Sequence, residues 1–450
     1  MSASAALFEK LGVRVPEVCL PAAAVDYAKW AVVACDQYSS EREYWEKAAA
    51  AVGSAPSTLN LIFPECYLED SDKAERVKRI KASMREYLAR GIVEGQSPGF
   101  ILVERHTPYE KAPRKGLMIA VDLEKYTYGK ESKSLIRPTE GTIVERLPPR
   151  MEIRRGAPLE LPHIMLLVDD PSRSIIEPLY AARDKLPKLY DFDLMLGSGR
   201  IRGWQVKGEA SLEKIAEAID RIADPAAFEA KYGKKDVLLF AVGDGNHSLA
   251  TAKAIWEETK KEKEGEPNLM EHPARFALVE LVNIYDEGLP FHPIHRVLFN
   301  IDEAKFFEAL KSYQAHSVEK LGSAEKAFAL ADAADSSLAG EHRIAFVSAK
   351  GAGLLRFAKP KANLAAGTIQ EFIDGWLKAN PGAIVDYIHG TESLEALAKK
   401  PGNLGLYLPP IDKAGFFGTV IRDGVMPRKT FSMGEAPEKR FYIEARRITR

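Results

Sequence analysis

The chain has 450 residues, which exceeds what one hydrophobic core usually serves, so we expect two or three lobes. Hydrophobic residues make up 46% and charged residues 28%, an ordinary globular composition that argues against a disordered chain. The formal net charge of −1 gives no general attraction to nucleic acid or to an anionic membrane, so we expect neither as a partner.

The beginning of the chain predicts a cytoplasmic protein. Residues 1–8 lack the basic stretch that opens a secretory signal peptide. The three cysteines, Cys19, Cys35 and Cys66, are odd in number and not closely paired, which favours reduced thiols over disulfides or a zinc site. No apolar run approaches the ~20 residues that cross a bilayer, so we expect a soluble protein.

Strand and helix patterns alternate along the whole chain, which predicts a mixed α/β (α+β) fold with several lobes. Up to residue 223 the predicted elements are a helix over 72–90, strands over 100–103, 116–121 and 163–168, a hairpin of 193–196 and 201–206, and a helix over 211–223 with Ser211 as N-cap. From residue 276 they are strands over 276–282, 344–347, 354–357 and 404–408, and helices over 302–312, 324–334, 368–379 and 392–399. We place the domain boundary after residue 265, giving regions 1–265 and 266–450, with one intertwined domain as the alternative.

The most informative segment is a strand, a glycine loop and a helix in succession over 237–260. Strand 237–242 leads into Gly243-Asp244-Gly245-Asn246-His247-Ser248, and a helix follows over 249–260. Such a loop presents unpaired backbone N–H groups and the positive end of a helix dipole, which together favour a bound phosphate. The glycines allow close backbone approach, the last three residues add side-chain donors, and Asp244 can hold a metal ion. The alternative is an ordinary tight turn with Ser248 as N-cap.

Three other segments carry groups suited to phosphate chemistry. Arg137 can grip a phosphate or carboxylate, and Glu140 can accept a proton from a substrate hydroxyl; the alternative is an ion pair on a turn. His295 and Arg296 are candidate anion donors, because their segment is too rich in proline for the helix that a His-x-x-His metal site needs. Lys429 is a further cation, for which a solvated surface is the alternative. We expect no structural metal.

Several of these motifs resemble a prokaryotic family, domain of unknown function 1015. Asp244-Gly245-Asn246-His247 is similar to its Asp-Gly-His-His-Arg motif, and Ile136-Arg137-Pro138-Thr139-Glu140 is similar to its Arg-Pro-His-Glu signature. The segments that resemble its other signatures are Trp30 to Tyr38, Pro293 to Arg296 and Met426 to Thr430. The resemblance spans nearly the whole chain in the expected order.

A similar loop occurs in the ADP-dependent free serine kinase of archaea, whose fold is related to the ParB and sulfiredoxin nucleotide-binding proteins. The resemblance implies a nucleotide-binding site at Asp244 to Ser248. We expect ATP or ADP there, held by its phosphates, with Mg²⁺ shared by Asp244 and the phosphates. This chain has Asn246 where the motif has its first His, and Ser248 where it has Arg. The loss of that guanidinium removes a bidentate phosphate clamp.

We therefore expect a nucleotide-dependent phosphotransferase, kinase-like in its chemistry, that acts on a small hydroxyl-bearing metabolite. The predicted catalytic residues are Glu140, Asp244 and His247, and the predicted phosphate-binding residues are Gly243, Gly245, Asn246, Ser248, Arg137, His295, Arg296 and Lys429. The alternative, favoured by Ser248, is a protein that binds or senses a nucleotide or phosphate ligand without chemistry. A third hypothesis is a loop that binds nothing, with the function housed around Asp36 and Tyr38. The oligomeric state is left open.

Overall fold

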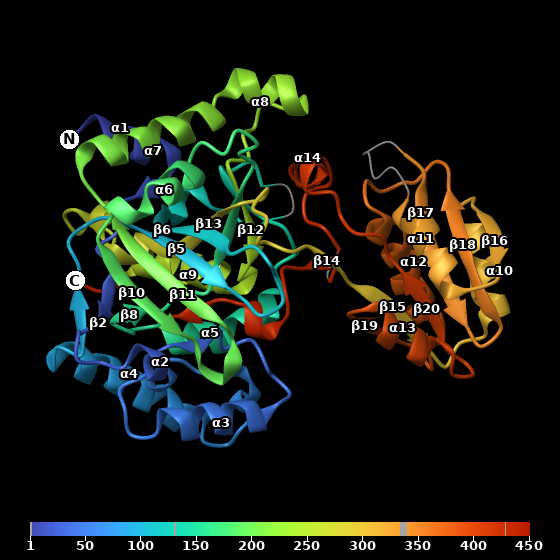
Figure 1. Cartoon of the computed structure of the whole chain (residues 1–450), viewed down its shortest axis with the longest axis horizontal. Coiled ribbons are helices and arrows are strands. Elements are labelled where there is room, and N and C mark those ends of the chain that lie inside the picture. Colours follow the sequence, from blue (N-terminus) through green and yellow to red (C-terminus); the bar gives the residue numbers. More distant parts are fainter. Residues whose placement is uncertain (1, 130–131, 334–339, 428) are drawn as a thin grey trace. The chain divides into compact units, whose positions relative to one another are not determined.

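The computed structural model describes residues 2–129, 132–333, 340–427 and 429–450. The chain forms two compact units (Figure 1): unit 1 is Met1–Leu289 with Gly434–Arg450, and unit 2 is Pro290–Met433. Unit 1 is therefore interrupted, and its last residues follow unit 2 in the sequence. The boundary placed after residue 265 lies inside unit 1. Among the described residues, no helix has the length and apolar character that a bilayer span requires.

Unit 1 is built on a mixed nine-stranded sheet, which confirms the predicted α/β class. Its strands in spatial order are β10 (Lys188–Asp193), β11 (Arg200–Val206), β5 (Phe100–His106), β6 (Arg114–Asp122), β13 (Phe276–Asn283), β9 (Met165–Val168), β12 (Phe240–Asp244) and β7 (Ile136–Pro138), and β1 (Val13–Arg14) pairs with β6. β7 runs parallel to β12, with Pro138 opposite Val242. Because parallel neighbours end at the same sheet edge, the segments that follow these two strands lie side by side.

Helices cover both faces of this sheet, with α2, α3 and α4 on one side and α1 and α7 on the other (Figure 1). Along β5, Ile101 and Val103 join a core that includes Trp45 of α3, while the Phe100 ring lies 5.4 Å from the Phe8 ring of α1. The helices of unit 1 are α1 (Ala3–Leu11), α2 (Tyr27–Trp30), α3 (Arg42–Val52), α4 (Lys73–Ala89), α5 (Leu147–Arg154), α6 (Ile176–Ala181), α7 (Glu209–Ile222), α8 (Pro225–Tyr232) and α9 (Asn246–Glu262). The helix predicted over 72–90 is confirmed as α4.

Two local predictions in unit 1 are wrong. α7 begins at Glu209 with Gly208 at the N-cap position, so Ser211 lies inside the helix. Residues 195–197 form a 3-10 turn, so the first strand of the hairpin is β10, which ends at Asp193. In both places a glycine with positive φ directly precedes the start of a regular element: Gly208, at 92°, precedes α7, and Gly199, at 90°, precedes β11.

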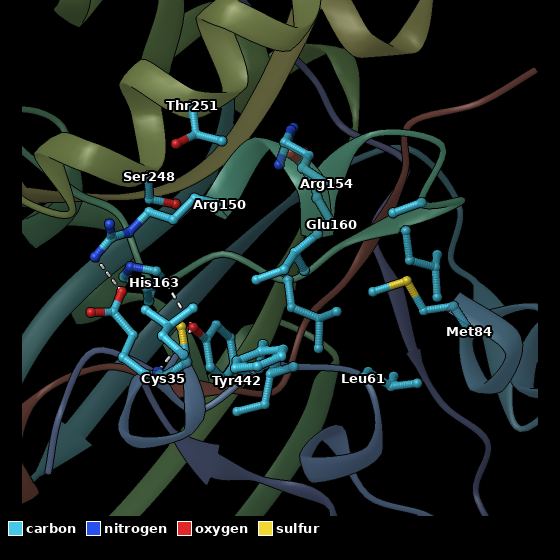
Figure 2. Close-up of a pocket in the computed structure, with 18 residues that line it drawn as sticks. Cys35, Leu61, Met84, Arg150, Arg154, Glu160, His163, Ser248, Thr251 and Tyr442 are labelled. Carbon is cyan, nitrogen blue, oxygen red and sulfur yellow. Dashed lines mark hydrogen bonds and ion pairs between the residues drawn. The ribbon is translucent and has the colours of Figure 1, made fainter. Parts of the chain in front are cut away.

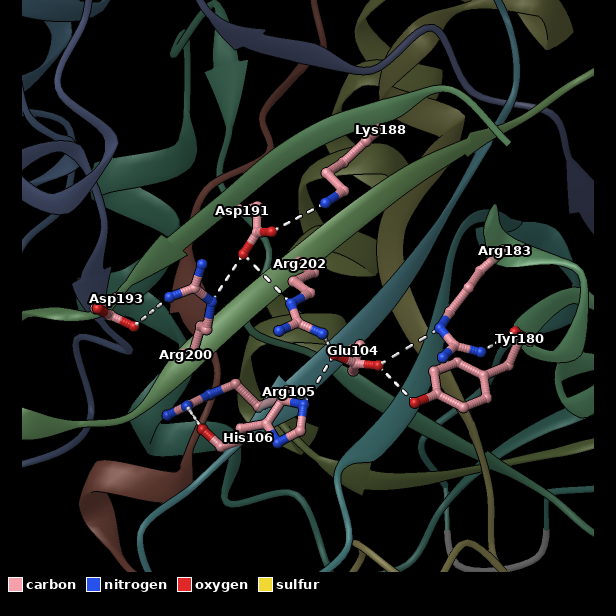
Figure 3. Close-up of polar contacts among 10 residues, drawn as sticks. All are labelled: Glu104, Arg105, His106, Tyr180, Arg183, Lys188, Asp191, Asp193, Arg200 and Arg202. Atoms are coloured by element: carbon pink, nitrogen blue, oxygen red, sulfur yellow. Dashed lines mark hydrogen bonds and ion pairs between the residues drawn. The ribbon is translucent and has the colours of Figure 1, made fainter. Parts of the chain in front are cut away.

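The hairpin of β10 and β11 is held to β5 by ion pairs around Glu104 (Figure 3). The Glu104 carboxylate accepts hydrogen bonds from Arg202 of β11 at 2.9 Å and from the Tyr180 hydroxyl at 2.5 Å. Asp191 of β10 contacts both Arg200 and Arg202. Because opposite charges alternate across the strands here, we interpret the cluster as a sheet-stabilising network and not as an anion site.

The returning segment, Gly434–Arg450, belongs to unit 1 and is anchored there by buried charged side chains. Arg440 forms ion pairs with Glu280 of β13 at 2.5 Å and with Glu444, and these carboxylates are 0% exposed. Gly116 of β6 makes space for the contact, since a Cβ there would lie 2.3 Å from the Glu280 carboxylate. Burial opposes ionisation of Glu280, yet Arg114 and Arg440 hold its pKa below the ordinary value.

Unit 2 contains a second sheet, of six strands, with helices between them. The strands in spatial order are β16 (Ser317–Leu321), β18 (Gly351–Phe357), β17 (His342–Ser348), β20 (Leu404–Tyr407), β15 (His295–Phe299) and β19 (Ile384–Ile388). The helices are α10 (Glu303–Tyr313), α11 (Ala324–Asp332), α12 (Ala365–Ala379), α13 (Thr391–Ala398) and α14 (Lys413–Asp423). The four helices predicted in this part of the chain are confirmed as α10 to α13, although residue 334 lies outside the described residues; α14 was not predicted.

We expect Arg440→Ala to lower the free energy of unfolding by about 3–5 kcal/mol, because it removes the cation paired with the buried Glu444 and leaves the buried Glu280 with Arg114 alone. Urea unfolding measures the change. Arg447→Ala removes an exposed arginine from the same segment and should change stability by no more than about 0.5 kcal/mol. Equal effects of the two substitutions would show that the buried guanidinium does not anchor the segment.

Candidate functional site

The loop between β12 and α9 has the predicted strand–loop–helix form. Gly243 and Asp244 end β12, and Gly245 occupies the N-cap position of α9 with φ 80° and ψ 28°, a left-handed conformation. A Cβ at Gly245 would lie 3.0 Å from Ile164 Cα. The helix starts at Asn246, so Ser248 lies in its first turn and is not the N-cap. A glycine at the N-cap supplies no side-chain acceptor for the first N–H groups of the helix.

Side chains at the start of α9 hold the segment that follows β7. The Thr139 N–H donates to Asn246 Oδ1 at 3.3 Å, and the Ile143 N–H donates to His247 Nε2 at 3.4 Å. His247 therefore presents an unprotonated Nε2 to this segment. Glu140 lies between these two contacts and is half-buried. The structure thus brings Glu140 and the glycine loop to one edge of the sheet.

Arg137 lies beside this edge, but its guanidinium contacts backbone. Arg137 Nε donates to the Ser134 carbonyl at 2.8 Å, and Nη2 donates to the carbonyls of Asp236 and Val237 at 2.7 and 3.2 Å. Burial lowers the pKa of Arg137, with the Asp236 carboxylate opposing this shift. These contacts join the segments that lead into β7 and β12, so the structure gives Arg137 a positioning contact where the sequence predicted a phosphate contact.

Lys439, from the returning segment, lies at the loop and was not selected from the sequence. Its Nζ is 3.2 Å from Asp244 Oδ2, and its side chain is 13% exposed. Asp244 Oδ1 accepts the Gly245 N–H at 2.9 Å. A charge run near a chain end usually lies in solvent, and no local pattern distinguishes Lys439 from that case.

Tyr442 of the returning segment reaches a second group of polar residues near the loop. Its hydroxyl is 2.7 Å from His163 Nδ1 and accepts the Cys35 N–H at 3.1 Å. His163 Nε2 is 3.9 Å from Asp36 Oδ2. Burial disfavours the Asp36 carboxylate, but His163, a hydrogen bond from Gln37, and Lys439 hold its pKa below the ordinary value. Of these residues, only Asp36 belonged to a site hypothesis drawn from the sequence, and its contact with His163 joins segments far apart in the chain.

A cavity of about 130 Å³ opens beside the first turns of α9 (Figure 2). Ser248 and Thr251 of α9 line it, together with His163 and Tyr442. The remainder of its wall is largely apolar and comes from Cys35, residues 61–68, Met84 of α4, and the stretch from Arg150 to Leu161. Among the described residues, no three His, Cys, Asp or Glu side chains are grouped as a metal site needs.

The other predicted anion-binding residues belong to unit 2. His295 Nδ1 accepts the Leu408 N–H at 3.2 Å, and burial first, then Arg296 and His389, lower the His295 pKa to about 4. Arg296 is 0% exposed and donates to Gln370 Oε1 at 3.0 Å. These contacts hold both side chains within the core of unit 2. Lys429 also belongs to unit 2, whereas Arg428 lies outside the described residues. Unit 1 therefore holds the glycine loop, Arg137 and Glu140, whereas His295, Arg296 and Lys429 belong to unit 2.

Comparison with known proteins gives one family. A family model described as "Protein of unknown function (DUF1015)" matches residues 19–376. No curated protein matches the chain. Among solved structures, a conserved hypothetical protein from Pyrococcus furiosus is 13% identical, with a TM-score of 0.36 over 74% of this chain and 95% of that one.

Two further solved structures are similarly distant. A free serine kinase in complex with AMP is 10% identical, with a TM-score of 0.36 over 74% of this chain and 91% of that one. SbnI with C-terminal truncation, from Staphylococcus aureus, is 10% identical, with a TM-score of 0.33 over 72% and 82%.

We expect Gly245→Ala to destabilise the protein more than Gly265→Ala. Both positions have left-handed φ, at 80° and 87°, so each alanine should cost about 1–2 kcal/mol of backbone strain. Only at position 245 does the new Cβ also meet Ile164, because nothing lies within 4 Å of a Cβ at Gly265. Chemical unfolding of the two variants measures the difference. If they lose equal stability, the contact with Ile164 does not constrain the loop.

Proposed function

We propose that this chain, which belongs to the DUF1015 family, is a nucleotide-dependent phosphotransferase acting on a small hydroxyl-bearing metabolite. The observation that carries the proposal is the loop from Gly243 to Ser248, which ends a strand, has a left-handed glycine at the helix N-cap, and carries a lysine against its aspartate. A terminal phosphate at this position meets the first N–H groups of α9 and the positive end of its dipole.

Lys439 supplies the cation that this loop lacks within its own sequence. Ser248 stands where the similar Asp-Gly-His-His-Arg motif has arginine. The side chain of Lys439, from the C-terminal segment of unit 1, contacts Asp244 of the same loop. A lysine binds phosphate as a point charge, so it neutralises the phosphate without the bidentate geometry of arginine. Mg²⁺ bound with the phosphates would take Asp244 as its protein ligand, because Mg²⁺ commonly uses only one or two carboxylates alongside phosphate and water.

The transfer step follows from this placement. The acceptor hydroxyl oxygen forms a bond to the terminal phosphorus of the nucleotide, and the bond from that phosphorus to the bridging oxygen breaks. The nucleotide leaves with one phosphate fewer, and the hydroxyl proton passes to Glu140. Such a reaction depends mainly on positioning and charge stabilisation, so a loop, a lysine and a carboxylate drawn from separate segments are sufficient.

One observation favours a second function, in which the protein binds a nucleotide or phosphate ligand and performs no transfer. Neither Arg137 nor Ser248 gives the loop a guanidinium, since Arg137 donates to backbone carbonyls. Tight nucleotide binding without turnover, at every acceptor tested, would select this function over the phosphotransferase.

We expect ATP or ADP with Mg²⁺ to raise the thermal midpoint of the protein, because a ligand that binds only the folded state stabilises it by RT ln(1 + [L]/Kd). Asp244→Ala and Lys439→Gln should reduce this rise. Asp193→Ala and Lys235→Gln remove exposed charges elsewhere in unit 1 and should leave it intact. Absence of any nucleotide effect in the unaltered protein would reject the phosphotransferase and also the nucleotide-binding form of the second function.

We expect Glu140→Gln to lower kcat by about 10²–10⁴-fold, the usual contribution of a positioned base, while the nucleotide-induced rise in thermal midpoint stays unchanged. The amide is close in size to the carboxylate but cannot accept the proton at neutral pH. Steady-state phosphate transfer to the acceptor measures kcat. Unaltered turnover in this variant would remove Glu140 from the mechanism without affecting the assignment of the loop.

A further inference from the structure

The cavity beside α9 has a polar end and an apolar end (Figure 2). Ser248 and His163 line the polar end, whereas Leu61 and Met84 lie at the opposite end. Its volume of about 130 Å³ is close to the ~150 Å³ of an engineered apolar cavity that accepts benzene. The space therefore suits one six-membered ring or a chain of similar size, and not a nucleoside.

The charged side chains at the cavity wall are paired with each other. Arg150 forms an ion pair with Glu65, and Arg154 forms one with Glu160. Glu160 is also paired with Arg446 at 2.7 Å. A zwitterionic or strongly charged ligand would have to compete with these pairs for its partners. The charges of the wall therefore give little attraction to an amino acid or another ionic metabolite.

The neutral polar groups lie where a hydroxyl would meet the phosphate loop. Ser248 belongs to the first turn of α9, the same turn on which the proposed phosphate is held. His163 Nε2 lies 3.9 Å from Asp36, beyond hydrogen-bond distance, and Tyr442 fixes the opposite ring nitrogen at 2.7 Å. The imidazole is thus held in orientation through Nδ1, and Nε2 is placed to contact a hydroxyl.

We propose that this cavity is the acceptor site, and that the acceptor is an uncharged alcohol with a hydrocarbon tail about the size of one six-membered ring. The tail packs between Leu61, Met84 and the stretch from Ile153 to Leu161, while the hydroxyl lies at the polar end beside His163 and Ser248. This assignment of substrate class rests on the proposed phosphotransferase function. Apolar area buried in the cavity supplies the affinity, and the polar end selects the hydroxyl group.

Binding is tested without nucleotide, using benzyl alcohol and 1-hexanol against glycerol and serine in isothermal titration of the whole protein. We expect the two apolar alcohols to bind and the two polar compounds to give no signal. Met84→Ala lengthens the apolar end, so 2-phenylethanol should gain about fourfold in affinity relative to benzyl alcohol, the effect of one additional buried methylene. Met118→Ala truncates a buried methionine that does not line the cavity and should leave this ratio unchanged.

Two results would overturn the substrate class. One is binding of glycerol or serine in preference to the apolar alcohols. The other is the same ratio of affinities for 2-phenylethanol and benzyl alcohol in Met84→Ala and in Met118→Ala. Phosphate transfer to benzyl alcohol is then measured with ATP or ADP. Nucleotide binding without alcohol binding rejects the cavity assignment and leaves the proposed function standing. Alcohol binding in a protein that no nucleotide stabilises rejects the phosphotransferase and retains the cavity as a site for apolar alcohols.

Discussion

The ion pairs of Arg440 with Glu280 and Glu444 determine much of the arrangement of unit 1. A buried guanidinium is tolerated only when its charge and its donors have partners, so the returning segment has few alternative positions. Arg105 and Arg114 restrict it further, since they donate to the carbonyls of Pro437 and Glu438, immediately before Lys439. The register of this segment is therefore fixed by charge as well as by apolar packing.

That register connects the core to the candidate site. Lys439 precedes the buried arginine and contacts Asp244, while Tyr442 follows it and contacts His163. The two flanking side chains thus serve the loop and the cavity from one anchor point. Lys439 also contributes to the lowered pKa of Asp36, so the carboxylates of Asp36 and Asp244 interact with the same cation. The electrostatics of the loop and of the cavity are consequently coupled through a single short segment.

The sequence predicts features that depend on neighbouring residues and misses those that depend on distant ones. The glycine loop and α9 are local, because apolar spacing and Gly245 define them, and both are confirmed. Arg137 and Lys439 show the limit. The sequence cannot distinguish an arginine that binds backbone carbonyls from one that binds phosphate, nor a partly buried lysine from a solvated one, because the partner of each lies far away in the chain. The burial of His295 is a further feature of this kind, because it comes from strands that pair only in the folded unit 2.

The interruption of unit 1 by unit 2 has a consequence for how the protein is made. Chains emerge from the ribosome in sequence order and their domains fold as they emerge. When residues 1–289 have been synthesised, Glu280 still lacks Arg440, and the cavity lacks the Tyr442 side of its wall. All of unit 2 must then be translated before Gly434–Arg450 can dock. Until Gly434–Arg450 has emerged, unit 1 is therefore an incomplete core, because Phe441, Tyr442 and Ile443 are missing from the apolar cluster that they complete.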